Sequence, residues 1–115
     1  MKDLKSNDIA SRQGNFYLKN IPPVGGMVII KTDWCSHCQR ALPELEEVSK
    51  LTGGVFPIYK LDGDKNKELV NSMGVSGFPT IKFINPDGQI SDNYQGARDK
   101  KAILDGICKR AKKCY

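Results

Sequence analysis

Five segments of the chain have the apolar runs or the apolar–polar alternation of β-strands. Residues 27–31 form a continuous run with β-branched side chains, which is typical of a central strand buried on both faces. Residues 80–84 alternate, and a turn containing Pro86 and Gly88 leads from them into the next strand as a hairpin. The predicted strands are residues 16–18, 27–31, 55–61, 80–84 and 89–91.

Three other segments carry apolar residues at helical spacing. The first runs from about residue 35 to Lys50 and contains Pro43, for which we expect a kink. The second spans residues 66–73, and the third spans residues 98–113 with an apolar inner face made of Ile103, Leu104, Ile107 and Ala111. This order of strands and helices predicts an α/β protein: a central mixed sheet of four to five strands, flanked by helices on both faces.

The polar segment 1–14 has little hydrophobic periodicity, and we interpret it as a flexible N-terminal arm before a single domain at 15–115. A chain of 115 residues is long enough for one hydrophobic core. No apolar run approaches the roughly 20 residues needed to span a bilayer, so we expect no membrane contact. The chain starts without the apolar core of a secretory signal and ends without a retention signal, so we expect a cytoplasmic protein.

The formal net charge is +5, and much of the basic excess lies near the C-terminus. One interpretation is a nucleic-acid-binding patch, and the other is the solvated face of the last helix. No aromatic side chains interleave with these charges, so we favour the solvated face and expect no nucleic acid partner. The residues concerned are Lys100, Lys101, Lys109, Arg110, Lys112 and Lys113.

The candidate chemistry lies in Cys35 and Cys38, three positions apart at the start of a predicted helix. This spacing places them about one helical turn apart, so their sulfurs can form a disulfide with little backbone movement. The free N–H groups and the dipole of the helix start stabilise an anion, which favours the thiolate of the first cysteine. We predict that Cys35 is exposed and attacks a substrate disulfide, and that Cys38 resolves the mixed disulfide.

Zinc sites use the same Cys-x-x-Cys spacing, which makes a metal site the alternative interpretation. Such a site needs two further ligands. Cys108 and Cys114 lack the usual paired spacing, and His37 lies between the first two ligands. We therefore expect no metal and no other cofactor.

The segment Trp34-Cys35-Ser36-His37-Cys38, after a buried strand, resembles the active site of the thioredoxin superfamily. Pro43 matches the proline that kinks the active-site helix of that family. Gly77-Phe78-Pro79-Thr80 is similar to the family's loop with a cis-proline. The resemblance covers residues 16–112 and implies the thioredoxin fold.

Within the superfamily, the sequence is most similar to the catalytic domains of protein disulfide isomerases. The likeness lies in segment 74–83, in His37, where thioredoxin itself has proline, and in Tyr94 followed by Arg98. It implies that Arg98 can approach the active site. A protonated His37 would stabilise the Cys35 thiolate and raise the reduction potential to roughly −200 to −240 mV, between the two family references. The alternative is an exposed imidazole with little effect.

The resemblance also assigns substrate-binding residues. It implies that Pro79 lies against the cysteine pair, with the preceding peptide bond cis. The backbone of Phe78 would then pair with an extended substrate segment, as in strand addition. Trp34, Phe78 and Gly77 are the expected substrate-binding residues. The alternative for Pro79 is a trans proline that starts an edge strand.

One position departs from the family pattern. Relatives usually bury a carboxylate on the strand six positions before the first cysteine, as proton acceptor for the resolving cysteine, and here that position is Ile29. Family position makes Lys60 the basic neighbour of the missing carboxylate. Cys38 would then lose its proton through water, or Lys60 and Arg98 would stabilise its thiolate. We expect slower resolution of mixed disulfides than in relatives that keep the acid.

The other two cysteines are Cys108 and Cys114, six residues apart near the C-terminus. We interpret Cys108 as a small core residue and Cys114 as an exposed tail thiol. The alternative is a regulatory disulfide or an intermolecular link. A disulfide between them would require the end of the last helix to fray.

The leading hypothesis is an enzyme that exchanges disulfides with protein substrates, as a reductase or as an oxidase or isomerase. The alternative is a redox-inactive thioredoxin-like module that binds partners through the loop at Phe78 and Pro79. We expect a monomer whose partners are proteins with disulfides or thiols, together with a reductase or oxidase that recycles it.

Overall fold

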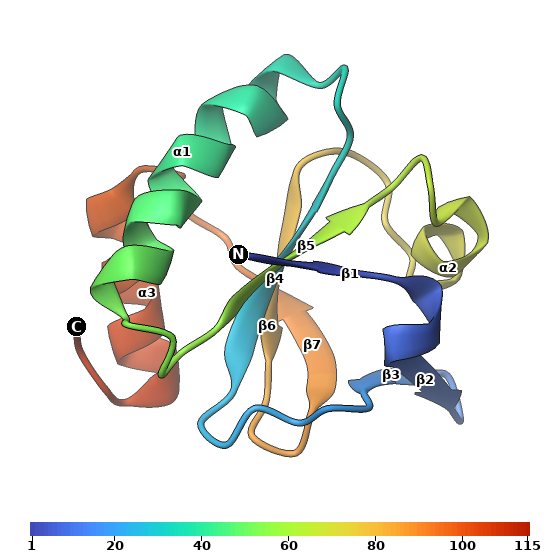
Figure 1. Cartoon of the computed structure of the whole chain (residues 1–115), viewed down its shortest axis with the longest axis horizontal. Helices are drawn as coiled ribbons and strands as arrows, with labels where there is room; N and C mark the ends of the chain where they lie inside the picture. Colours follow the sequence, from blue (N-terminus) through green and yellow to red (C-terminus); the bar gives the residue numbers. More distant parts are fainter.

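Seven strands form one mixed sheet in the computed structural model, which describes residues 1–115 (Figure 1). The strand order is β1-β5-β4-β6-β7-β3-β2. The central strand β4 runs parallel to β5 and antiparallel to β6. The strands are β1 (Lys2–Leu4), β2 (Ile9–Arg12), β3 (Asn15–Leu18), β4 (Gly26–Lys31), β5 (Ile58–Asp62), β6 (Thr80–Ile84) and β7 (Gln89–Asn93).

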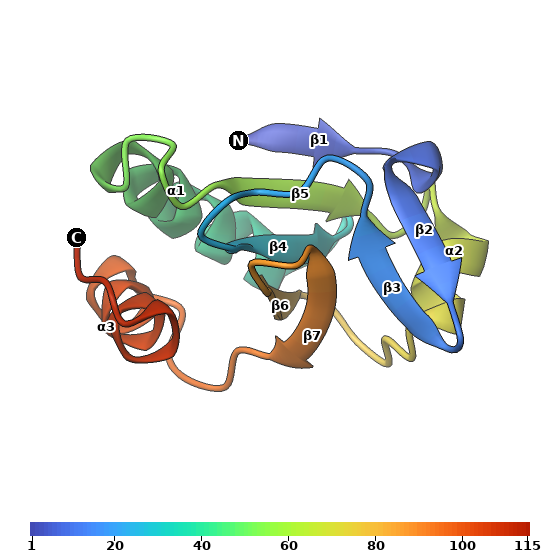
Figure 2. The same ribbon diagram turned by 90° about the horizontal axis from the view of Figure 1, so that it is seen from below.

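Helices cover both faces of the sheet, as the sequence predicts (Figures 1 and 2). On one face lie α1 (Ser36–Leu51) and α3 (Lys100–Ala111), and on the other lies α2 (Lys67–Ser72). Successive side chains of a strand point to opposite faces. Ile29 of β4 therefore packs in the cluster under α1 and α3, and Ile30 packs in the cluster with Val70 of α2.

The N-terminal segment is part of the sheet, so the prediction of a flexible arm at 1–14 is wrong. β1 pairs in parallel with β5, a short 3-10 helix at Ser6–Asp8 follows, and β2 pairs with β3. Leu4 and Ile9 are buried in the core under α2. β1 has three residues and buries only one side chain, so its sequence is too short to show an alternating pattern. These additional strands explain why the sheet has seven strands rather than four to five.

Replacing Leu4 with alanine tests the contribution of the N-terminal strand. Leu4 is 5% exposed, so Leu4→Ala is expected to lower the free energy of unfolding by about 2–3 kcal/mol, the loss typical of a truncated core leucine. Denaturant unfolding measures this difference. Ile21→Ala is the control, because Ile21 is 53% exposed and its truncation is expected to change stability by under about 0.5 kcal/mol. A Leu4→Ala effect as small as the control would show that the strand is not part of the stable fold.

Two predicted boundaries differ from the structure. The predicted strand at 55–61 begins three residues later, at Ile58, because Val55 is half exposed and Pro57 cannot donate to a strand ladder. The predicted helix at 98–113 ends at Ala111, where Lys112 adopts a left-handed conformation with φ 56°. That reversal directs the last residues back toward α3.

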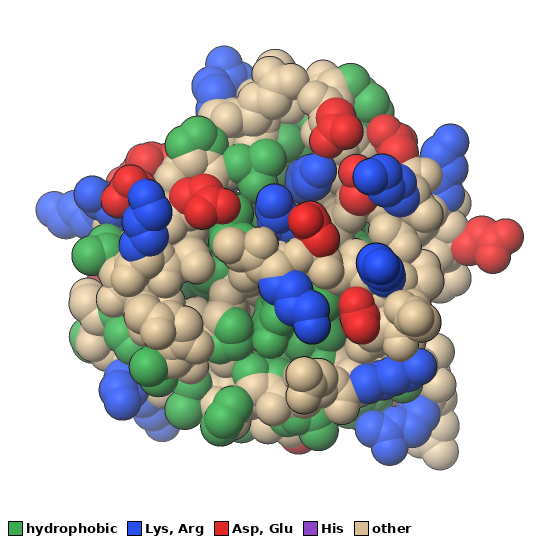
Figure 3. Space-filling model, viewed as in Figure 1, with side chains coloured by type: hydrophobic (Ala, Val, Ile, Leu, Met, Phe, Trp, Pro, Cys, Tyr) green, Lys and Arg blue, Asp and Glu red, His purple; other side chains and the backbone are tan.

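The surface shows no single dominant patch of charge in the view of Figure 3. Basic and acidic side chains are intermixed on this face. Arg110 of α3 is tied to the sheet by an ion pair with Asp92 of β7, and its guanidinium stacks over Phe83. In the structure, none of the helices has the length and the apolar character needed to cross a membrane.

Candidate active site

Cys35 and Cys38 meet where the central strand passes into the first helix. Cys35 is the N-cap residue of α1, and its Sγ accepts a hydrogen bond from the backbone N–H of Cys38 at 3.1 Å. An N-cap side chain satisfies an amide of the first turn, here with sulfur as the acceptor. Both cysteines are free thiols. The site therefore holds a dithiol one helical turn wide, with an amide hydrogen directed at the leading sulfur.

The two thiols are more enclosed than the sequence suggests. Cys35 is 5% exposed and Cys38 is fully buried. The expectation of an exposed Cys35 is wrong because the N-cap geometry turns its sulfur toward the first helical turn rather than toward solvent. Cys38 lies behind it with the apolar core, which matches the place predicted for a resolving cysteine.

The environment of Cys38 holds it as a thiol. Burial raises the pKa of Cys38 to about 11, and its hydrogen bond with Cys35 adds to this effect. The backbone N–H of Thr32 and the positive charge of Arg98 act in the opposite direction and lower this pKa. Among the side chains, Arg98 is thus the cation that favours the Cys38 thiolate.

An aromatic ledge, made of Trp34 and Phe78, lies beside the cysteines. The Trp34 side chain is 68% exposed, and its ring meets the Phe78 ring edge to face at 6.0 Å between centroids. The indole Nε1 donates a hydrogen bond to Asp64 at 2.9 Å. Asp64 is a site residue that sequence analysis missed, because thirty positions separate it from Trp34 and no motif links them. The ledge is a fixed apolar surface open to solvent.

The ledge depends on a glycine. A Cβ at Gly63 would lie 2.6 Å from the Phe78 ring, so only glycine leaves room for that ring. Gly63→Ala is expected to lower the free energy of unfolding by about 1–3 kcal/mol, the usual effect of overpacking. Urea unfolding of the single variants and of the double variant with Phe78→Ala forms a double-mutant cycle. In the Phe78→Ala background, Gly63→Ala should no longer lower the free energy of unfolding. An unchanged loss of stability there would show that the added Cβ clashes with a group other than the Phe78 ring.

The loop that carries Phe78 of the ledge also contains a cis peptide bond. The Phe78–Pro79 bond is cis, so the alternative of a trans edge-strand proline is wrong. Pro79 and Arg98 line one small polar cavity of about 230 Å³, together with Thr80 and Tyr94. The predicted residues Pro79 and Arg98 are therefore neighbours. Gly77 has open space around it, because a Cβ at this position would have no atom within 4 Å.

Arg98 is positioned by its neighbours on both sides. The Tyr94 hydroxyl donates to the carbonyl of Ala97 at 2.6 Å, which closes the loop before it. The backbone N–H of Lys100 donates to Glu44 of α1 at 3.1 Å, which ties the start of α3 to the active-site helix. Arg98 itself has no hydrogen bond or ion pair, so its charge is available to Cys38 and to a ligand.

Lys60 lies on β5, beside the central strand β4. It pairs in register with Ile29, which is fully buried in the core under α1. The Lys60 ammonium lies 3.7 Å from Asp3, on the edge strand that sequence analysis took for an arm. Arg98 is the cation that lowers the pKa of Cys38, and Lys60 is not among the groups that shift it. A role for either residue in stabilising the Cys38 thiolate stays a prediction.

His37 lies in the first turn of α1 and contacts Arg40 one turn later. A guanidinium nitrogen of Arg40 lies 2.8 Å from His37 Nδ1. A guanidinium only donates, so a hydrogen bond between these two groups needs Nδ1 as the acceptor. The expected effect on the reduction potential requires instead a ring protonated on both nitrogens. The role of His37 stays a prediction.

The remaining cysteines form a disulfide, Cys108–Cys114, with 4.3 Å between their Cα atoms. The interpretation of two separate thiols is wrong because α3 stops at Ala111 and the left-handed Lys112 turns the chain back. Sequence analysis identified this condition as fraying of the helix end, but the residues carry no signal for it. No cluster of three or more His, Cys, Asp or Glu side chains in the structure could hold a metal ion.

Comparisons with known proteins agree with this geometry. The family model described as Thioredoxin matches residues 20–109. Protein disulfide isomerase-like 2-3 of Oryza sativa subsp. japonica is 42% identical over 82 residues, which are 70% of this chain and 18% of that protein. Protein disulfide-isomerase A3 of Gallus gallus is 36% identical over 88 residues, 75% of this chain and 17% of that protein. The chain thus spans less than a fifth of the length of these relatives.

Solved structures show the same fold at low identity. A structure of human ERp44 in its zinc-bound form superimposes with a TM-score of 0.76 and 22% identity, over 96% of this chain and 32% of that one. The thioredoxin of Malassezia sympodialis gives a TM-score of 0.64 and 22% identity, over 79% of this chain and 78% of that one.

These findings overturn the expected location. The relatives are protein disulfide isomerases, and the structural neighbours ERp44 and ERdj5 are proteins of the endoplasmic reticulum, so the prediction of a cytoplasmic protein is wrong. The prediction was based on the first and last residues of the sequence. A chain that covers so small a part of its relatives does not support that inference.

Proposed function

Because the chain belongs to the thioredoxin family, we propose that it exchanges disulfides with protein substrates through Cys35 and Cys38. The observation that carries the proposal is the hydrogen bond from the Cys38 amide to Cys35 Sγ at the start of α1. A hydrogen bond and a helix N-terminus both favour a sulfur that carries negative charge. The relatives' names, protein disulfide isomerases, support the same chemistry.

In the first step, the Cys35 thiolate attacks one sulfur of a substrate disulfide. A bond forms between Cys35 Sγ and that sulfur, and the second substrate sulfur leaves as a thiolate. The product is a mixed disulfide between protein and substrate. The amide hydrogen of Cys38 is placed to stabilise Cys35 Sγ before attack and when it becomes the leaving group in reverse.

In the second step, Cys38 must lose its proton and attack Cys35 Sγ. The Cys35–Cys38 bond forms, the mixed disulfide breaks, and the substrate leaves reduced by two electrons in total. Burial opposes this step because it holds Cys38 protonated. Ile29 offers no carboxylate to take the proton, so water accepts it and Arg98 stabilises the resulting anion.

The substrate chain binds across the cysteines, between Trp34 and the proline loop. The open apolar ring of Trp34 packs against side chains that flank the substrate cysteine. The backbone at Phe78, with open space at Gly77, pairs with an extended segment of the substrate. Backbone pairing of this kind recognises an extended peptide and does not depend on one sequence, so many protein substrates can bind.

Turnover requires a second redox partner. Oxidised protein is returned to the dithiol by a reductase, or reduced protein to the disulfide by an oxidase, and the chain itself supplies only the two sulfurs. His37 contributes to the balance between the two forms when its ring is protonated. The thiol chemistry of both steps needs no metal or organic cofactor.

Reduction of insulin by dithiothreitol tests the proposal. The protein is expected to shorten the time before the insulin B chain precipitates, because exchange through Cys35 and Cys38 relays electrons faster than dithiothreitol alone. A redox-inactive binding module would leave the uncatalysed time course unchanged. The Cys35→Ser/Cys38→Ser variant is the matched control for binding without exchange.

A further inference from the structure

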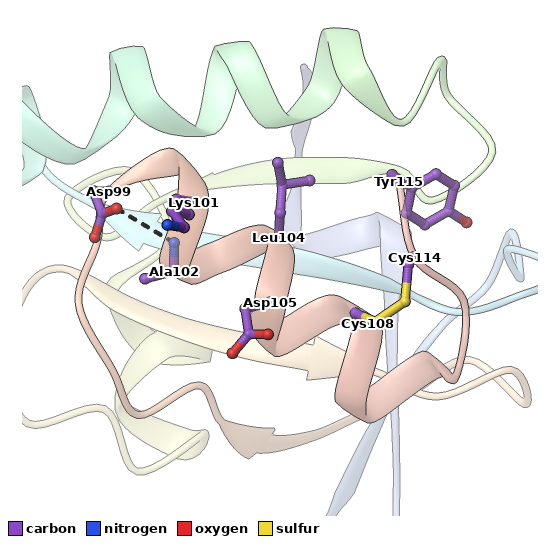
Figure 4. Close-up of a pocket in the computed structure, with 8 residues that line it drawn as sticks. All are labelled: Asp99, Lys101, Ala102, Leu104, Asp105, Cys108, Cys114 and Tyr115. Carbon is purple, nitrogen blue, oxygen red and sulfur yellow. Dashed lines mark hydrogen bonds between the residues drawn. A yellow bond between two sulfur atoms is a disulfide. The ribbon is translucent and has the colours of Figure 1, made fainter.

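The disulfide at the end of α3 holds a short tail against the core. Cys108 lies in the last turn of α3, and Cys114 lies beyond the left-handed turn at Lys112 (Figure 4). Tyr115 follows directly, and its ring packs at 6.4 Å between centroids against Phe56, a residue of the core under α1 and α3. The disulfide therefore fixes the position of an aromatic side chain on the hydrophobic core.

The docking of Tyr115 is imperfect in one respect. Its hydroxyl is buried and has no hydrogen-bond partner. A buried polar group without a partner disfavours the state that buries it, because the group is hydrated when the tail is free. The ring contact with Phe56 favours the docked tail, and the hydroxyl opposes it. The docked tail thus gains free energy from the ring contact and loses free energy at the hydroxyl, and the closed disulfide adds a covalent constraint.

The disulfide is accessible from solvent. Cys114 is exposed and Cys108 is half-buried. Both line a groove of about 710 Å³ along α3, and Leu104 forms part of its floor (Figure 4). Lys112 and Lys113 are exposed just before Cys114 and favour the approach of an anionic thiol.

The site is separate from the Cys35–Cys38 pair. Arg98, which acts on Cys38, precedes the first turn of α3, whereas Cys108 lies in its last turn. At about 1.5 Å of rise per residue, about 12 Å of helix separates the start of α3 from Cys108. The two pairs therefore belong to different elements, the first to the start of α1 and the second to the end of α3.

We propose that Cys108–Cys114 is a second, exchangeable disulfide that an anionic small thiol, of which glutathione is the type, opens to release the tail that carries Tyr115. The thiolate of the small thiol attacks Cys114 Sγ, and the Cys108–Cys114 bond breaks with Cys108 leaving as a thiolate that takes a proton. A second small thiol then attacks the mixed disulfide at the sulfur of the first small thiol. Cys114 is left as a thiol, and the two small thiols leave joined as one oxidised dimer.

Equilibration with glutathione tests this proposal independently of the exchange at Cys35. A Cys35→Ser/Cys38→Ser variant leaves the Cys108–Cys114 couple as the sole redox pair. The variant is held in buffers of reduced and oxidised glutathione at several ratios, and alkylation with mass spectrometry gives the fraction of open disulfide. We expect a full transition from closed to open across these buffers. Amide hydrogen exchange at residues 108–115 should rise in step with the open fraction.

Two substitutions of Tyr115 are expected to change the equilibrium constant for disulfide formation in opposite directions. Tyr115→Ala removes the ring contact, so it is expected to lower the equilibrium constant for disulfide formation by about three- to tenfold. Tyr115→Phe keeps the ring and removes the unpartnered hydroxyl, so it is expected to raise that constant. Tyr17→Ala is the matched control, because Tyr17 is a half-buried tyrosine on β3 that contacts Arg12.

Three results would overturn the proposal. The disulfide could stay closed at every glutathione ratio, or the two cysteines could be found as thiols in air-oxidised protein. The Tyr115 variants could also leave the equilibrium where the Tyr17→Ala control leaves it. None of these results bears on insulin reduction by Cys35 and Cys38, so the failure of one proposal is distinguishable from the failure of the other.

Discussion

Replacing Cys38 with serine is expected to arrest the protein as a mixed disulfide after a single encounter with substrate. Cys35 keeps its place at the N-cap of α1, and its hydrogen bond comes from the backbone of residue 38, so the substitution leaves attack intact. Resolution is lost because a hydroxyl cannot displace the substrate sulfur. Incubation with oxidised insulin followed by non-reducing electrophoresis should show a stable covalent adduct.

Cys35→Ser is the matched control for this trapping experiment. It removes the leading sulfur and leaves Cys38, which is fully buried and held as a thiol. We expect no adduct and no insulin reduction from this variant. An adduct that forms as readily on Cys38 in the Cys35→Ser protein as on Cys35 in the Cys38→Ser protein would reverse the assigned roles.

The second large effect is a steep pH dependence of resolution. The thiolate of Cys38 is the attacking species, and burial raises the pKa of Cys38 to about 11. Below that pKa, the thiolate fraction grows with rising pH, by about tenfold for each unit. The rate constant for resolution is therefore expected to rise about 100-fold between pH 7 and pH 9, with no plateau. The second release phase after mixing reduced protein with dithiobisnitrobenzoate measures this rate constant.

Arg98 supplies the matched test of this pH profile. Its positive charge lowers the pKa of Cys38, so Arg98→Gln is expected to raise that pKa and slow resolution at each pH without changing the slope. Lys101→Gln removes a nearby exposed cation of α3 that does not act on Cys38, so it should leave the profile unchanged. A plateau near neutral pH in the unmodified protein would reveal a proton acceptor that the proposed mechanism lacks.

Adding a proton acceptor at Ile29 tests whether its absence slows the resolution step. Ile29→Asp would place a carboxylate under α1, at the position where the family usually carries one, and is expected to accelerate resolution below pH 8. Ile29→Asn adds polarity without a proton acceptor and is the control. Both variants disturb a fully buried position, so their folding is checked by circular dichroism before the kinetics are compared.

The parts of the fold that the sequence predicts are those with a complete local pattern. Residues 27–30 are all apolar because β4 is buried on both faces by the helices, and the predicted strand at 27–31 differs from β4 by one residue at its start. The alternation at 80–84 gives β6 with its ends. The cysteine pair at the helix start and the cis peptide bond before Pro79 follow from motifs that are short enough to recognise in the sequence.

The parts that escape prediction depend on contacts between distant segments. β1 is stabilised by pairing with β5, more than fifty residues away, and its single buried leucine leaves no periodic signal. The bond from Trp34 to Asp64 joins two loops that only the fold brings together. The Cys108–Cys114 disulfide depends on the left-handed backbone conformation of Lys112. Lysine rarely adopts this conformation, so the sequence does not predict it.

The central claim is that Cys35 carries the attacking sulfur and that Cys38 is the buried, resolving cysteine. Brief alkylation of the reduced protein with iodoacetamide, followed by peptide mapping, tests it most directly. We expect Cys35 to be labelled first, and Cys38 to be labelled only when the protein is unfolded. Labelling of Cys38 as fast as Cys35 in the folded protein, or no labelling of Cys35 at all, would contradict it.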